Sequence, residues 1–123
     1  MKPVALALLL VAAASNANAQ AVDPALGKRL WMQCRACHAL KPGEPPKAGP
    51  SLHGVFGAKA GGRPDFAYSP AMKASGVVWT DATLDRFIAN PAKAMKGNRM
   101  GYFGMPDPKN RAALIAFMKA ETR

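Results

Sequence analysis

Two cysteines and a histidine lie within five consecutive residues, Cys34-Arg35-Ala36-Cys37-His38. The C-x-x-C-H pattern is the attachment signature of a c-type haem. Two thiols about one helical turn apart can bond to the two vinyl groups on one porphyrin edge, and the imidazole that follows can bind the iron. A C-x-x-C pair can also be a thioredoxin-like redox pair, which needs a strand before it and a helix after it. The chain has no other cysteine, so no second pair could complete a zinc site.

The segments on either side of this motif favour haem attachment. Before it, Asp23-Pro24 is a capping residue followed by proline at the first helical position, and a helical apolar stripe leads directly into Cys34. After it, residues 41–62 are rich in glycine and proline and show no helix or strand periodicity. A loop of this length in a compact domain usually wraps something or is disordered. Its apolar residues are too many for a disordered linker, so we expect them to pack on a buried ligand. They are Leu52, Val55 and Phe56.

Three more helices are indicated further along the chain. Ser69-Pro70 begins a short helix that closes at Gly76, Thr80-Asp81 begins one that ends at Asn90-Pro91, and Asp107-Pro108 caps the last. A turn over residues 91–95 leads into a second loop at 96–106. No strand alternation and no internal repeat is present. The pattern predicts an all-α single domain with four or five helices and two long loops wrapped around one covalently attached haem.

The first nineteen residues have the features of a secretory signal peptide. Lys2 supplies the positive charge, residues 4–14 form a short apolar run, and Ala17-Asn18-Ala19 is a small-x-small cleavage site. We therefore expect residues 1–19 to be removed near Gln20 and residues 20–123 to form the mature domain in the periplasm. A retained N-terminal anchor is the alternative, but the apolar run is short for a membrane span. No membrane insertion is expected after cleavage.

The chain carries 17 Lys and Arg residues against 7 Asp and Glu, a formal net charge of +10. Such a balance suits nucleic acid, an anionic membrane or an acidic protein partner. Export argues against nucleic acid, and no block of five like charges exists. We favour steering toward acidic docking surfaces of redox proteins over a basic surface that only aids solubility. We expect the protein to be a monomer.

In the order of these motifs and helices the chain resembles a class I cytochrome c, of the small mitochondrial and bacterial photosynthetic type. The resemblance covers essentially the whole mature chain and rests on the order of several motifs. After the attachment site come the segments beginning Gly49-Pro50-Ser51-Leu52, Phe66-Ala67-Tyr68-Ser69, Gly76-Val77-Val78-Trp79, Asn90-Pro91, Gly97-Asn98-Arg99-Met100 and Arg111-Ala112-Ala113-Leu114.

The resemblance implies a set of haem contacts beyond Cys34 and Cys37. It implies that His38 and Met100 are the two axial ligands of the iron. The carbonyl of Pro50 would accept the ring N–H of His38, and the side chains of Tyr68 and Trp79 would donate to a buried propionate.

Other candidates for the sixth ligand receive different roles. His53 matches a histidine that ties its loop together by hydrogen bonding, and Met95 and Met105 are expected to be packing residues. The family tends to exchange its methionine for a lysine at high pH, and Lys93 and Lys96 are the candidates here.

The chain departs from the family pattern at four positions near the haem. These are Phe87 for a tyrosine, Met72 for an asparagine, Ala58 for a basic residue and Lys96 for a proline. None removes a ligand, but they bear on the potential and on the stability of the methionine loop.

The resemblance implies a diffusible carrier of single electrons between a cytochrome bc-type complex and a terminal oxidase or photosynthetic reaction centre. The alternatives are a dedicated electron acceptor of a periplasmic dehydrogenase and a haem peroxidase or gas sensor, which requires an open distal position. With both axial positions filled, the protein would not be an enzyme.

Overall fold

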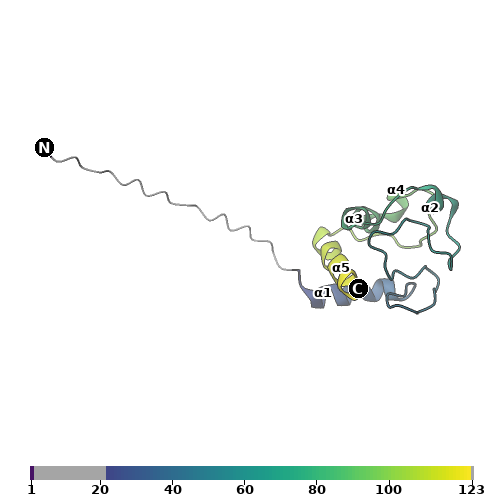
Figure 1. Cartoon of the computed structure of the whole chain (residues 1–123), viewed down its shortest axis with the longest axis horizontal. Helices are drawn as coiled ribbons and strands as arrows, with labels where there is room; N and C mark the ends of the chain where they lie inside the picture. The colour runs from purple at the N-terminus through teal and green to yellow at the C-terminus, as the bar shows by residue number, and fades with distance from the viewer. Residues whose placement is uncertain (2–21, 123) are drawn as a thin grey trace.

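The computed structural model describes Met1 and residues 22–122 (Figure 1). The helices in this part of the chain are α1 (Pro24–Arg35), α2 (Pro70–Ala74), α3 (Asp81–Ala89), α4 (Pro91–Ala94) and α5 (Pro108–Glu121). The described residues contain no β-strand, and one isolated antiparallel bridge joins Lys59 to Val78. The all-α prediction is therefore confirmed. The predicted signal cleavage near Gln20 lies outside the described residues.

Each of these helices begins where a side chain satisfies a backbone N–H of the first turn. The capping residues are Asp23, Ser69, Thr80, Asn90 and Asp107. In four of the five, proline follows at the first helical position, where a missing N–H costs nothing. The segment predicted as a turn after Asn90 forms the one-turn helix α4, because the Asn90 side chain accepts from Lys93 N at 3.1 Å.

Helices α1 and α5 cross at one end of the domain (Figure 1). The crossing is close because residue 27 is glycine: a Cβ there would overlap the carbonyl oxygen of Ala113 and lie 2.7 Å from Cβ of Phe117. Trp31 packs on Phe117 with ring centroids 6.4 Å apart. Gly27 and Trp31 are the buried residues of α1, whereas Leu26 and Leu30, which fall on the helical apolar stripe with Trp31, are only half-buried. The buried edge of α1 is therefore set by the contact with α5.

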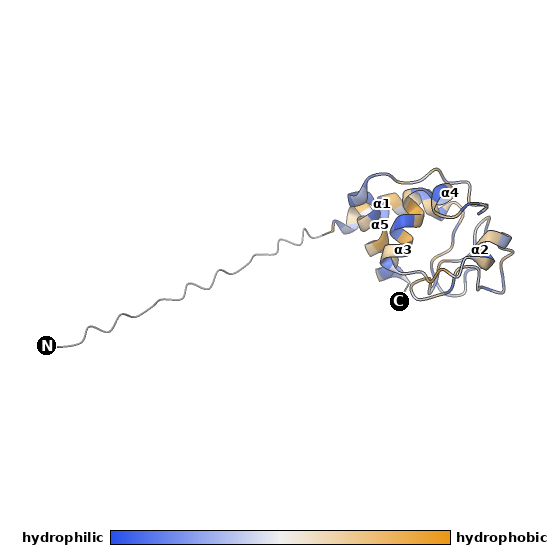
Figure 2. Ribbon diagram, turned by 90° about the horizontal axis from the view of Figure 1, so that it is seen from above, coloured by the Kyte–Doolittle hydropathy of each residue, from blue (hydrophilic) through white to orange (hydrophobic). Residues whose placement is uncertain are grey.

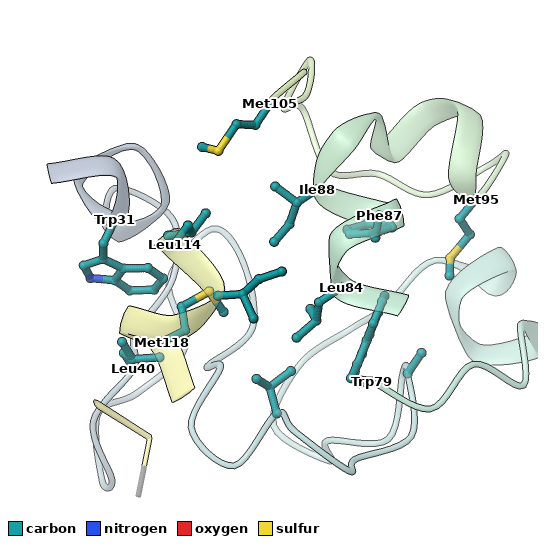
Figure 3. Close-up of a cluster of buried hydrophobic side chains, with 13 residues drawn as sticks. Trp31, Leu40, Trp79, Leu84, Phe87, Ile88, Met95, Met105, Leu114 and Met118 are labelled. Atoms are coloured by element: carbon teal, nitrogen blue, oxygen red, sulfur yellow. The ribbon is translucent and has the colours of Figure 1, made fainter. Parts of the chain in front are cut away.

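Side chains from α1, α3, α5 and the loops meet in one buried cluster (Figure 3). Leu114 and Met118 of α5 are almost completely buried at its centre. On the α3 side, Trp79 packs edge-on against Phe87 with centroids 5.2 Å apart. Hydrophilic residues occupy the other sides of the helices (Figure 2). Of the described helices, none is long and apolar enough to cross a membrane.

Helix α2 packs on none of the other described helices. It lies across the domain from α1 and α5 in both views (Figures 1 and 2). The loop before it is anchored instead by backbone pairing, since Ala60 N donates to Val77 O at 2.8 Å and Trp79 N donates to Ala58 O at 2.9 Å. This side of the domain is therefore built from loops, and the apolar side chains of those loops face the cluster. The partly buried ones are Leu52, Phe56, Val77 and Met100, and Met72 of α2 joins them.

Candidate functional site

The end of α1 turns tightly so that both cysteines and His38 lie on consecutive turns. Cys37 N and His38 N both donate to Cys34 O, at 3.0 and 2.9 Å. Cys34 is half-buried against the core, Cys37 is exposed, and both are free thiols. Burial, with a smaller contribution from Cys37, raises the pKa of the Cys34 thiol to about 11. A redox-active pair has a lowered thiol pKa, so this pair lacks the electrostatics of a thioredoxin-like site.

His38 is buried, and one of its ring nitrogens is fixed by the backbone. His38 Nδ1 lies 2.7 Å from the carbonyl oxygen of Pro50. A carbonyl oxygen can only accept, so Nδ1 carries the proton and Nε2 holds the free lone pair. Burial lowers the pKa of His38, and the bond to Pro50 opposes that shift. The ring is therefore held neutral with Nε2 ready to bind a metal.

Gly49 leaves the space that this ring occupies. A Cβ on Gly49 would lie 2.5 Å from His38 Cε1 and 2.9 Å from Nδ1. The backbone at Gly49 runs against the turn at residues 34–38, which we call the haem-attachment turn. Gly49 N donates to Cys37 O and Leu52 N donates to Ala39 O, each at 2.8 Å. Lys47 Nζ adds a bond of 3.0 Å to Arg35 O. The glycine–proline loop is thereby fastened to the segment that presents His38.

Met100 is half-buried beside the core, in a loop that one asparagine holds in shape. The amide nitrogen of Asn98 donates to Pro91 O and to Met95 O, each at 2.8 Å. Its amide oxygen accepts from Met100 N at 2.9 Å. In the sequence Asn98 stands out only as part of the Gly97-Asn98-Arg99-Met100 motif. The residue type was a signal, because asparagine side chains commonly form turns by accepting a hydrogen bond from the backbone N–H two residues further on.

The other two loop methionines lie in the core. Met95 and Met105 belong to the buried cluster, where Figure 3 shows them on opposite sides of α3. Burial of this kind agrees with the packing role predicted for both.

Of the two predicted propionate donors, Trp79 is buried and Tyr68 is half-buried. Tyr68 stacks edge-on against Phe66 with centroids 5.0 Å apart, and burial raises the pKa of Tyr68. The two side chains belong to different aromatic pairs, since Trp79 packs on Phe87. Their role toward a propionate stays a prediction.

The loop around His53 is tied through the main chain. Arg63 donates from its guanidinium to His53 O at 3.3 Å, and His53 N donates to Ser51 Oγ at 3.2 Å. The ring nitrogen Nδ1 is buried and makes no hydrogen bond. The predicted tie is therefore not made by this nitrogen, and the backbone of His53 supplies the connection through Ser51 and Arg63.

The residues brought together here fit a c-type haem. Two cysteines outside any disulfide flank one turn, a neutral imidazole offers Nε2, and a glycine clears the space beside it. Half-buried apolar side chains face the cluster from the loop side of the domain, where α2 packs on none of the other described helices. Met100 on that side carries a thioether, the type of soft group that small electron-carrying cytochromes use as a ligand; its role as a ligand stays a prediction.

Comparison with known proteins agrees with this arrangement. The model of the family described as Cytochrome c matches residues 24–121. Cytochrome c2 of Rhodomicrobium vannielii is 40% identical over 122 residues, 98% of each chain. Cytochrome c of Arabidopsis thaliana is 43% identical over 91 residues, 74% of this chain and 81% of that protein. The structure of cytochrome cH from Methylobacterium extorquens has 40% identity and a TM-score of 0.74, covering 80% of this chain and 98% of that one.

These matches span most of the chain and of each relative, so the chain belongs to the cytochrome c family. The predicted family and fold are confirmed. The protein holds one haem c, attached covalently through Cys34 and Cys37, and takes part in electron transport.

Proposed function

We propose that the protein is a periplasmic carrier of single electrons that shuttles between a cytochrome bc-type complex and a terminal oxidase or photosynthetic reaction centre. The observation that carries this proposal is the buried His38 ring, whose Nδ1 is held at 2.7 Å from Pro50 O. Such a hydrogen bond fixes the ring orientation and raises the basicity of the ligand nitrogen. The likeness to bacterial cytochrome c2 supports a periplasmic location, and in this proposal residues 1–19 are removed on export.

In this proposal His38 Nε2 and the Met100 sulfur are the axial ligands. Haem c, when bound, supplies the one-electron chemistry of its iron. The hydrogen bond to Pro50 holds the His38 ring in place, and the three hydrogen bonds of Asn98 hold the loop that carries Met100. A soft thioether ligand favours the ferrous state and raises the potential. Tyr68 and Trp79 are proposed to hold a propionate.

The spectrum of the oxidised holoprotein tests the ligand assignment. Wild type is expected to show a methionine–iron absorption band at neutral pH, and Met100→Ala is expected to lose it and to have a lower reduction potential. Met105→Leu is the matched control, because Met105 is buried and should keep the band. A band that persists in Met100→Ala would show that another residue is the ligand.

Carbon monoxide separates the carrier from a gas sensor or peroxidase. A carrier with both axial positions filled is expected to bind no carbon monoxide in the reduced state at neutral pH. Fast binding by reduced wild type would point to an open distal position, and the protein would then be a gas-binding or peroxidase-type cytochrome.

A further inference from the structure

One aromatic side chain stands fully outside the core. Phe103 is 98% exposed, whereas the neighbouring Met105 is buried. Single exposed apolar residues are common on protein surfaces and need no explanation by themselves. Phe103 differs because the backbone around it is held in place and because of what surrounds it.

The segment that carries Phe103 is pinned on both sides. On one side, Tyr102 OH donates to Gln33 Oε1 of α1 at 3.1 Å. On the other, Met105 N donates to Ile88 O of α3 at 2.9 Å. Gly104 has φ +117° and lies so close to the Ala89 carbonyl that a Cβ would overlap it. The exposed ring is therefore presented by a fixed backbone, so little conformational entropy is lost when it is buried in a partner.

This segment lies beside the haem-attachment turn. Gln33, the partner of Tyr102, directly precedes Cys34, and Cys37 on the same turn is exposed. Met32, also on this part of α1, is 57% exposed and its sulfur lies 3.8 Å from the Arg35 guanidinium. The segment that carries Phe103 thus lies beside the turn that bears both cysteines, where the haem would be attached.

Two segments around Phe103 carry only positive charge, and the acidic residue nearest to it in the chain is Asp107, which caps α5. Residues 24–43 and residues 86–106 each contain four Lys or Arg and no Asp or Glu. Elsewhere, three of the seven acidic side chains form ion pairs with basic ones. The ion pairs in the described residues are Arg63–Asp65, Arg111–Asp85 and Lys119–Asp81. The two segments that bear the proposed ligands are therefore free of acidic groups, and they complement an acidic surface.

We propose that Phe103 is the apolar anchor of the docking surface and enters an apolar pocket, bordered by carboxylates, on an acidic redox protein. This inference rests on the proposed function and names the residue that gives the complex its short-range affinity. Basic residues raise the rate of encounter, whereas a rigid aromatic that is desolvated in a pocket slows dissociation. A protein pocket suits the site better than a lipid surface, because the segment that carries the ring lies beside the haem-attachment turn and must be held there during transfer.

The test uses the reduced holoprotein with a purified membrane-bound cytochrome c oxidase as the probe. Phe103→Ala is compared with Val78→Ala, which also removes an exposed apolar side chain but lies in the bridge to Lys59. At about 0.15 M salt, Phe103→Ala is expected to lower kcat/KM about tenfold, and Val78→Ala to leave it unchanged. The slope of log rate against log salt should stay that of wild type. Oxidation by ferricyanide, which needs no protein docking, should be the same in all three proteins.

Each other result has a distinct meaning. If wild type reacts with the oxidase and Phe103→Ala reacts equally fast, the anchor is wrong while the carrier proposal stands. If wild type shows no salt-dependent reaction, the proposed oxidase shuttle fails and the anchor loses its partner. If Phe103→Ala instead loses binding to vesicles of anionic phosphatidylglycerol while its oxidation by the oxidase is unchanged, the ring contacts membranes and the proposal is overturned. A slower ferricyanide reaction would mean that Phe103 acts on the haem environment, which also contradicts it.

Discussion

Substitution of Gly49 by alanine tests how His38 is held. The added Cβ would lie 2.5 Å from His38 Cε1, whereas ordinary contacts are at 3.4–4 Å, so the ring or the loop must move by about 0.9 Å or more. The loop cannot yield easily, because Gly49 N is bonded to Cys37 O. A ring shift of that size breaks the 2.7 Å bond from Nδ1 to Pro50 O. Overpacking of about 1–3 kcal/mol and a lost buried hydrogen bond of about 1 kcal/mol together predict a loss of about 2–4 kcal/mol in the free energy of unfolding.

Denaturation of the oxidised holoprotein by guanidinium, followed by far-UV circular dichroism, measures this loss. Gly101→Ala is the matched control, since a Cβ on Gly101 meets nothing within 4 Å and its φ is not left-handed. The control is expected to lie within about 0.5 kcal/mol of wild type or to be slightly more stable. If Gly49→Ala proved as stable as Gly101→Ala, the argument that glycine clears the space for His38 would be refuted.

Three further substitutions have expected outcomes. Asn98→Ala removes three hydrogen bonds from the methionine loop and should cost about 1–3 kcal/mol, with the methionine–iron band lost at a lower temperature than in wild type; equal melting of that band would contradict the role of the amide. Arg111→Ala breaks a 2.7 Å ion pair to α3 and two bonds to loop carbonyls, so thermal unfolding should show a loss of about 1–3 kcal/mol that Arg111→Lys only partly restores. The double variant Lys93→Ala, Lys96→Ala should keep its methionine–iron band to higher pH in an alkaline titration, and loss of the band at the wild-type pH would exclude both lysines as replacement ligands.

Helix positions were readable from the sequence because the signals are local. An aspartate, serine or asparagine followed by proline marks the start of a helix in four cases. Three of these starts were predicted as helices, and the fourth, Asn90-Pro91, begins a one-turn helix where a turn was predicted. The buried edge of α1 was read less well. It depends on Gly27 meeting Ala113, a contact between residues far apart in the chain, which the spacing of leucines does not contain.

The role of His53 shows the same limit. The resemblance assigned its ring a hydrogen bond, yet ring nitrogen Nδ1 has no partner and the backbone oxygen of the residue accepts from Arg63 instead. Which atom of a residue is used depends on the path of the loop, and the glycine–proline loop has no periodicity from which that path could be inferred.

The C-x-x-C-H motif and the ordered motifs after it determined that the chain attaches a haem, because covalent attachment needs only a spacing along one turn. The sequence also carried the helix starts and the excess of basic residues. The resemblance implied that Pro50 O accepts from the His38 ring, and the tertiary structure decided that the donor is Nδ1, which leaves Nε2 free. It also decided that Asn98 braces Met100 and that Phe103 stands exposed beside the attachment turn. These features join segments distant in sequence, and the packing that joins them has no local signature.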